Sequence, residues 1–248
     1  MRTSAKPASL TVTDDAQMFL GHFGLALAAK RVIPCASLGT TVMAAQWADG
    51  VWPLFVLLGL EHAEIRPGIT VVTPLDFVSY PFSHSLVADF GWAMLFALAY
   101  GTLRKDWRTA LWLGVLVMSH WMLDVVAHRP DMPTWPGGPK LGAGLWNSLP
   151  ATLVAEFALF GAGLWLYLRT TRARDRLGSV LPWAFAATLV IIYLAAVFGP
   201  PPPSERVLAM SGLAGWLFVA WGYWIDRHRS TTVAEPADAA RALAARSG

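Results

Sequence analysis

The sequence predicts an all-α polytopic membrane protein, a transmembrane helical bundle of about six to seven spans. Its 248 residues are 55% hydrophobic and only 14% charged, and the mean hydropathy is +0.47. Apolar runs recur along the chain, and several approach the length of about 20 residues that one helical crossing needs. The 13 tryptophans fit the same setting, because tryptophan is enriched at membrane–water interfaces.

Seven apolar runs can be ordered along the chain as candidate spans. They cover residues 17–33, 35–60, 86–103, 109–127, 150–168, 180–198 and 207–225. The Gly-Pro-Pro-Pro-Pro run at 199–203 cannot continue a helix and separates the last two. We therefore expect three parts: an N-terminal tail at 1–16, a single transmembrane domain at 17–229 and a flexible C-terminal tail at 230–248.

The first candidate span is the weakest, because it is short and His22 interrupts it. A full span, a re-entrant helix and an interfacial helix are all open for it. An Ala-x-Ala pattern before Lys30 is also typical of a cleaved signal peptide. However, Asp14 and Asp15 stand where a signal peptide carries positive charge, so we expect the segment to be retained.

Lysine and arginine are divided unequally between the two sets of span ends. One set holds Lys30, Arg31, Arg104, Lys105, Arg108, Arg169, Arg172, Arg174, Arg176, Arg227 and Arg229. The opposite set holds Arg2, Lys6, Arg66, Arg129, Lys140 and Arg206. The larger, clustered set predicts the cytoplasmic side. With seven spans, the N-terminus is then outside and the C-terminus inside.

This topology places the ionisable residues of the spans toward the outer face. They are His22, Asp49, His84, His120, Asp124, His128 and Glu156. The lysine and arginine count does not use these residues, so their common depth is an independent sign that they share a site. Ionisable groups within a bilayer are costly and usually mark function.

The spacing of His120, Asp124 and His128 puts all three on one face of the helix predicted at 109–127. His120 and Asp124 can share one ion, as the two histidines of an H-E-x-x-H helix do. His128 is about 12 Å from His120 along the axis. It can join the same ion only if the helix unwinds before Pro130; otherwise it serves a second ion or the substrate.

Nitrogen and oxygen donors of this kind predict a divalent metal site with one or two ions. The candidate ligands are His22, Asp49, His84, His120, Asp124 and His128. They outnumber the protein ligands of a four-coordinate catalytic zinc, which favours two ions or one ion with supporting partners. The donor set suits zinc, manganese or iron, with zinc our first expectation. Cys35, the single cysteine, excludes a Cys-rich zinc site and an intrachain disulfide.

Taken singly, most of these residues also have a structural explanation. His22 can pack between helices, and Asp49 can cap a broken helix, because Asp-Gly is a turn signal. His84 can stand in a loop beside a capping serine, and His128 suits a helix C-terminus. Asp124 has no such explanation, since an unpaired carboxylate costs about 2.5–3.5 kcal/mol at the bilayer centre. Together, the residues favour the metal site.

The motifs GHFG, AD-x-x-WP, SHS and SHW-x-LD-x-x-x-H follow one another within residues 18–168. In this order they resemble the predicted membrane-bound metal-dependent hydrolases of bacteria, a family that includes a LexA-regulated inner-membrane protein. The resemblance implies a multi-pass protein of the bacterial inner membrane. It also implies that the metal-site positions are His22, Asp49, His84, His120, Asp124 and His128. Asp89 and the last two spans lie outside the matching pattern.

These observations predict metal-assisted hydrolysis near the outer membrane face. Asp49 or Asp124 would accept a proton from the attacking water. Arg129 and Lys140, in the loop after the fourth span, would contact a phosphate or head group, and so would Arg66. We expect an amphiphilic lipid or phosphoester as substrate and membrane lipid as partner, and no nucleic acid.

Two other functions use the same residue types. A cation or proton transporter also carries Asp, Glu and His within the membrane, but it needs polar groups through the full depth. The inner halves of the predicted spans are apolar, which favours a one-sided site. A b-type haem protein would have paired histidines without clustered carboxylates. We therefore rank this function below the hydrolase and the transporter.

Overall fold

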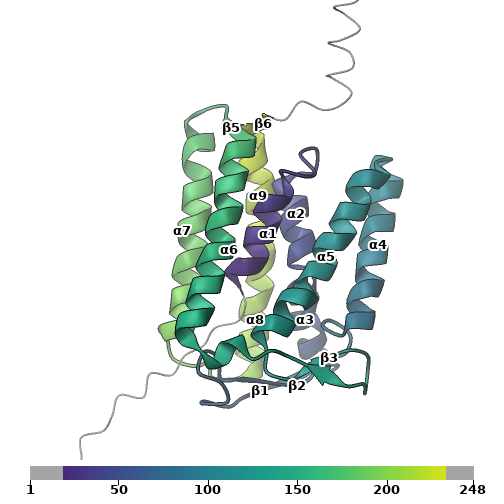
Figure 1. The fold of residues 1–248 in the computed structure, drawn as a ribbon, viewed down its shortest axis with the longest axis vertical. Coiled ribbons are helices and arrows are strands. Elements are labelled where there is room, and N and C mark those ends of the chain that lie inside the picture. The colour runs from purple at the N-terminus through teal and green to yellow at the C-terminus, as the bar shows by residue number, and fades with distance from the viewer. Residues whose placement is uncertain (1–18, 233–248) are drawn as a thin grey trace, which may run out of the picture.

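The computed structural model describes residues 19–232, which form a bundle of roughly parallel helices (Figure 1). Within these residues, five helical stretches are long and apolar enough to cross a membrane. They are α4 (Leu86–Arg104), α5 (Trp107–Ala127), α6 (Leu149–Thr170), α7 (Arg176–Phe198) and the stretch Glu205–Arg227. The last is built from α8 (Glu205–Gly212), the short turn η2 (Leu213–Gly215) and α9 (Trp216–Arg227).

The mainly helical fold is confirmed, and residues 19–232 contain five helical stretches that could cross a membrane, fewer than the six to seven spans predicted. The run at 17–33 forms only α1 (Leu20–Ala29), and the run at 35–60 forms two helices, α2 (Leu38–Ala45) and α3 (Trp47–Leu57). The break lies at Gln46, whose φ of −105° and ψ of 16° are not helical. Helices of 10, 8 and 11 residues are each shorter than a bilayer crossing.

The short helices lie inside the bundle rather than on its surface. Seven residues of α1 and seven of α2 are buried, on nearly every side of each helix. Many apolar side chains of α4 and α7, in contrast, are exposed on the outer surface. Interrupted backbone is tolerated at membrane depth where protein surrounds it. Hydropathy alone cannot separate an enclosed helix from a lipid-facing one.

α1 crosses α6 at a contact that only glycine permits. A Cβ placed on Gly24 would lie 2.6 Å from the Leu159 carbonyl oxygen, and one on Gly163 would collide with the Gly24 carbonyl. Small residues at such crossings let two backbones approach closely. Glu156 of α6, fully buried, accepts hydrogen bonds from the Phe19 and Gly21 amides at 2.9 and 2.6 Å. α6 therefore holds the beginning of α1 in place.

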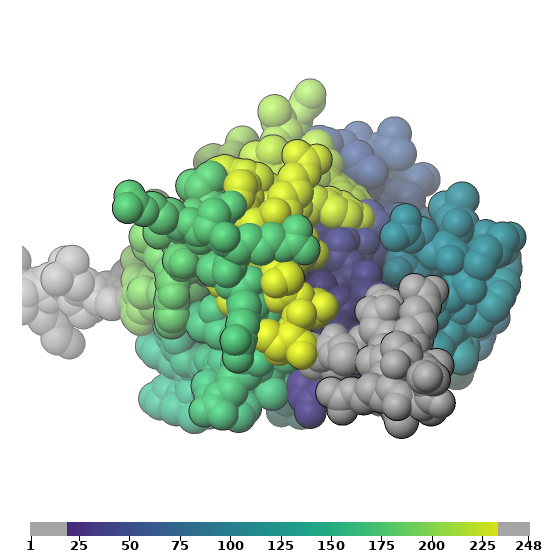
Figure 2. All heavy atoms as spheres, turned by 90° about the horizontal axis from the view of Figure 1, so that it is seen from above, coloured from purple at the N-terminus to yellow at the C-terminus, as the bar shows by residue number. Residues whose placement is uncertain are grey.

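One end of the bundle carries the larger set of basic residues. The α4–α5 and α6–α7 connections and the end of α9 all lie there, at the top of Figure 1 and facing the viewer in Figure 2. A two-stranded antiparallel sheet of β5 (Thr171–Ala173) and β6 (Arg229–Thr231) joins two of them. β6 extends two residues into the segment 230–248 expected as a tail; residues 233–248 and the tail 1–16 lie outside the described residues.

The opposite end is closed by two short hairpins. β1 (His62–Ile65) pairs with β2 (Leu75–Ser79), and β3 (Met132–Pro133) pairs with β4 (Lys140–Leu141). The turn η1 (Leu145–Asn147) follows and buries Trp146. Asp76 of β2 pairs with both Arg66 and Arg129, and so ties the two hairpin regions together.

Candidate metal centre

Five of the predicted site residues lie together inside the bundle. His22 comes from α1, Asp49 from α3, His84 from the segment before α4, and His120 and Asp124 from α5. The side chains of the three histidines and Asp124 are 1–6% exposed, whereas that of Asp49 is 29% exposed. The cluster thus has one member that can be reached from outside.

The two carboxylates lie between the imidazoles. Asp124 Oδ1 is 3.1 Å from His22 Nε2, and Asp124 Oδ2 is 3.3 Å from His120 Nε2 and 3.8 Å from His84 Nε2. Asp49 Oδ1 is 3.4 Å from His84 Nε2 and 3.7 Å from His120 Nε2. Asp49 and Asp124 therefore face the same imidazole nitrogens from two different helices.

The other ring nitrogen of His120 is fixed by the protein backbone. His120 Nδ1 is 2.8 Å from the Ala45 carbonyl oxygen, which can only accept a hydrogen bond, so Nδ1 carries the proton. In the neutral ring, Nε2 is then the nitrogen with the lone pair, and it faces the cluster. A hydrogen bond of this kind orients histidine ligands in metal sites.

A hydroxyl and a carboxylate support His84 in the same way. His84 Nδ1 is 2.7 Å from Ser83 Oγ, which in turn donates to Glu61 Oε2 at 2.6 Å. Because the serine proton goes to Glu61, Ser83 accepts the proton of Nδ1, and His84 Nε2 also presents a lone pair to the cluster. Glu61 further accepts from the amides of Phe82 and Ser83, which fixes the loop.

The donor atoms fit a divalent cation. Two overlapping groups, His22–Asp49–His120 and His84–His120–Asp124, each have ligand atoms within 4.8 Å of one another. His120 Nε2 and His22 Nδ1 are buried and have no hydrogen-bond partner within residues 19–232. The rings of His22 and His120 stack at 3.8 Å. A lone pair left unpartnered between two carboxylates is a position that a cation satisfies.

His128 lies beside these groups but belongs to neither. α5 ends at Ala127, and His128 has an extended backbone, so the helix does stop before Pro130. Its Nδ1 is 2.9 Å from Asp131 Oδ1, and its ring packs 4.0 Å from that of Trp146. It lines a small cavity of about 10 Å³ together with His22, Asp49, His84 and Asp124. This places His128 at the edge of the cluster.

The loop around His128 is built from buried polar contacts. Tyr80 donates a hydrogen bond to Asp131 Oδ1 at 3.3 Å. Burial and the nearby Asp131 raise the pKa of Tyr80 well above its ordinary value, so the phenol stays a neutral donor. Asp131 Oδ1 therefore accepts hydrogen bonds from both Tyr80 and His128, and this contact orients the His128 ring.

The two predicted substrate contacts lie at the end of the bundle that the hairpins close, Arg129 before β3 and Lys140 in β4. The Arg129 guanidinium pairs with Asp76, and its Nε is 3.1 Å from Asp131 Oδ2. Lys140 is exposed, and its Nζ is 3.4 Å from the Val78 carbonyl oxygen. Arg129 is already engaged by two carboxylates, so Lys140 has the more available charge.

Two buried carboxyls outside the cluster differ in their surroundings. Glu156 is satisfied by the backbone of α1, as described above. Asp89 of α4 is fully buried, and neither carboxyl oxygen has a hydrogen-bond partner in the described part of the chain. The sequence placed Glu156 among the ionisable residues of the spans and left Asp89 outside the recognised pattern, and it predicted a partner for neither.

Glu61, Ser83 and Asp131 were not predicted as parts of the site. The capping serine expected beside His84 is Ser85, whose Oγ accepts from the Ala88 amide. The SHS motif does contain a signal, because Ser83 directly precedes His84. Glu61 is 22 residues from Ser83, and only the β1–β2 hairpin brings the two together.

Comparisons of the chain with models of protein families, with curated proteins and with solved structures give no match. The chemistry of the cluster and its place in the bundle are therefore the basis for assigning a function.

Proposed function

We propose that this chain is an integral membrane metal-dependent hydrolase that acts on a lipid or phosphoester near one face of the membrane. The single observation that carries the proposal is the buried Nε2 of His120, which has no hydrogen-bond partner among the described residues. It is buried between two carboxylates, and its tautomer is fixed by a backbone carbonyl. Such an arrangement is costly without a ligand.

The carboxylates have different roles in this proposal. A bound zinc or similar ion would lower the pKa of water and polarise the scissile bond. Asp124 is buried and contacts His22 and His120, so it would anchor the ion. Asp49 is the least buried member of the cluster, so it would accept the proton of the attacking water.

The same proposal covers the membrane and the orientation. The motifs resemble those of bacterial inner-membrane hydrolases, which supports the same membrane for this chain, and the Lys/Arg asymmetry supports a cytoplasmic position for the basic end of the bundle. The cluster then lies toward the outer face. Lys140, and Arg129 to a lesser degree, would contact the polar head group of the substrate. Toward the basic end of the bundle, α5 buries the apolar residues Leu113, Leu116 and Val117. The absence of polar residues among these three favours a one-sided site over a transport path.

Metal analysis of the purified protein tests the proposal most directly. After incubation with zinc and removal of unbound ion, wild type should retain at least one ion per chain, and His120→Ala should lose most of it. His62→Ala is the matched control, because the side chain of His62 is 56% exposed at the hairpin end. Equal retention by His120→Ala and wild type, or none by either, would refute the metal site.

Hydrolysis is tested with the same three proteins. A chromogenic phosphodiester and a chromogenic carboxyl ester should be assayed with and without zinc. The expected result is zinc-dependent turnover by wild type and His62→Ala, with at least a hundredfold loss in His120→Ala, of the order seen when an interaction of the transition state is removed. Retained metal without any turnover across substrates would contradict the hydrolase.

A further inference from the structure

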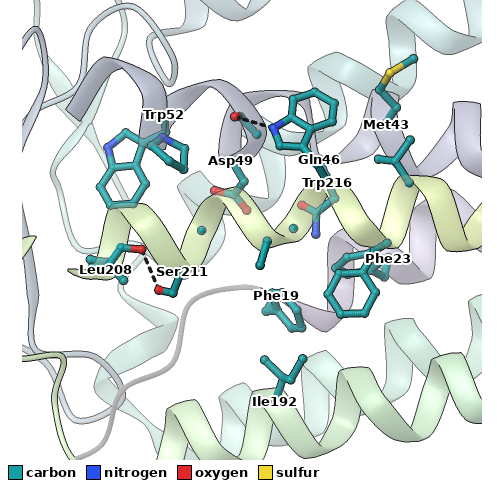
Figure 3. Close-up of a pocket in the computed structure, with 17 residues that line it drawn as sticks. Phe19, Phe23, Met43, Gln46, Asp49, Trp52, Ile192, Leu208, Ser211 and Trp216 are labelled. Atoms are coloured by element: carbon teal, nitrogen blue, oxygen red, sulfur yellow. Dashed lines mark hydrogen bonds between the residues drawn. The ribbon is translucent and has the colours of Figure 1, made fainter. Parts of the chain in front are cut away.

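An apolar cavity of about 290 Å³ lies beside Asp49 (Figure 3). Its walls come from α1, α3, α7 and the stretch from α8 to α9. The apolar lining includes Phe19, Phe23, Trp52, Ile192, Leu208 and Phe218. Among the members of the metal cluster, Asp49 alone lines both this cavity and the small cavity that the ligand atoms share.

The polar groups of the cavity are concentrated at one place. Asp49 lines it, and Gln46, one turn earlier, has a buried side-chain oxygen without a partner in the described chain. Two further polar groups are already satisfied, because Trp216 Nε1 donates to the Gly50 carbonyl and Ser211 Oγ to the Leu208 carbonyl. The buried Nε1 of Trp52, which also borders the small cavity, has no partner in the described chain either, and the remaining walls are apolar.

The cavity is open along the side of η2. Ala214 and Gly215 line it and are exposed, and a Cβ on Gly215 would meet nothing within 4 Å. The flanking outer surface is apolar, with Ile191 and Leu217 exposed by 66% and 69%. A molecule that reaches this opening therefore comes from the hydrocarbon region rather than from water.

We infer that this cavity holds the apolar chain of an amphiphilic substrate whose polar, scissile group lies at Asp49 and Gln46. The inference rests on the proposed function and names its substrate class: a single-chain lipid, or one chain of a larger lipid. Binding pockets of this kind have apolar walls and a few polar groups that fix orientation. Water would be excluded along the chain but retained at Asp49.

Photolabelling tests where the chain lies. The probe is a medium-chain alkyl phosphate with a diazirine at the far end of the chain, applied to the zinc-loaded protein in detergent. Labelled peptides should contain Ile192, Leu208 or Phe218. Unlabelled alkyl phosphates should compete, each added methylene strengthening competition about fourfold until the cavity is full.

Filling the cavity should remove the label. Gly215→Phe projects a ring into the opening, and Ala214→Phe repeats the block from the adjacent position if the first variant does not fold. Gly161→Phe is the matched control, since Gly161 is exposed on α6 with nothing within 4 Å of a Cβ. The expected result is at least a tenfold loss of label in the blocked variant and none in the control, with metal content unchanged in both.

The outcomes separate this inference from the proposed function. Label spread over the lipid-facing surfaces of α4 and α7, and unchanged by the block, would overturn the inference while metal retention stands. Specific labelling of the cavity in a protein that neither retains zinc nor hydrolyses esters would uphold the chain-binding cavity and refute the hydrolase.

Discussion

Glu156 of α6 accepts a hydrogen bond from the amide of Gly21, one residue before the metal-site candidate His22, at 2.6 Å. The first amides of a helix lack partners within the helix and attract negative charge. A carboxylate from a neighbouring helix satisfies them here, although it lies inside the membrane domain. The cost of burying Glu156 is thus offset by the backbone that positions His22.

Glu156→Ala should destabilise the protein and weaken zinc retention together. Loss of the acceptor leaves two buried amides unsatisfied, at about 1–3 kcal/mol each. Glu156→Gln keeps one acceptor oxygen and should lose less. Thermal unfolding in detergent and metal analysis measure the two effects, with Glu64→Ala as control because Glu64 is 55% exposed. An Ala variant as stable as wild type would show that the amides find another partner.

Asp124→Asn should lower zinc affinity far more than Asp89→Asn. Asp124 lies within 3.1–3.3 Å of two imidazoles, whereas Asp89 has no hydrogen-bond partner among the described residues. We expect at least a tenfold weakening for Asp124→Asn, of the size that disturbed metal sites show. Competition with a chelator measures it, on variants matched for expression and thermal stability. The reverse order would mean that Asp89 is the ligand.

Substitutions of the two serines that flank His84 should have different effects, one on zinc affinity and the other on the stability of the fold. Ser83→Ala removes the link between His84 and Glu61, and zinc affinity should fall about 10–100-fold. Ser85→Ala removes the N-cap of α4, and stability should fall by about 1 kcal/mol with little change in affinity. Chelator competition and denaturant unfolding on both variants provide the comparison. Identical effects of the two changes would contradict the assignment.

Gly163→Ala should destabilise the bundle, while Gly161→Ala should not. A methyl group on Gly163 meets the backbone of Gly24, so α1 must move away from α6 at a cost of about 1–3 kcal/mol. Gly161 is two residues away on the exposed surface, and nothing lies within 4 Å of its added carbon. Thermal unfolding compares the two, and zinc retention should fall with stability only in Gly163→Ala. Equal stability of the two variants would argue against the close crossing.

The orientation can be tested by thiol accessibility in intact bacterial cells. In a Cys35→Ala background, an impermeant reagent should label Pro136→Cys, in the loop between β3 and β4, and should not label Arg174→Cys until the cells are lysed. Both positions are exposed, so differences in burial do not explain a difference in labelling. Labelling of both before lysis would contradict the topology.

Five spans could be predicted from composition, because a lipid-facing helix must be apolar over its whole length. The two spans predicted within residues 17–60 were wrong, because α1 and α2 are apolar where protein encloses them and not where lipid does. In the site, the spacing of four between His120 and Asp124 predicted a shared helix face. His22 and His84 could be grouped with them only because the predicted topology puts all four residues at a similar depth in the membrane. Glu61 could not be predicted, because its contact with Ser83 depends on the register of the β1–β2 hairpin, which the sequence does not determine on its own.

The interruption of the helix at Gln46 links the broken helix of this segment to the orientation of the His120 ring. In an uninterrupted span, the Ala45 carbonyl would bond to the amide four residues ahead, as every interior carbonyl does. Because the ladder stops there, that oxygen is available to orient His120. A change that repaired the ladder would make the helix continuous and would remove the hydrogen bond that orients His120. Helix continuity and the orientation of His120 therefore place opposite requirements on this short stretch of backbone.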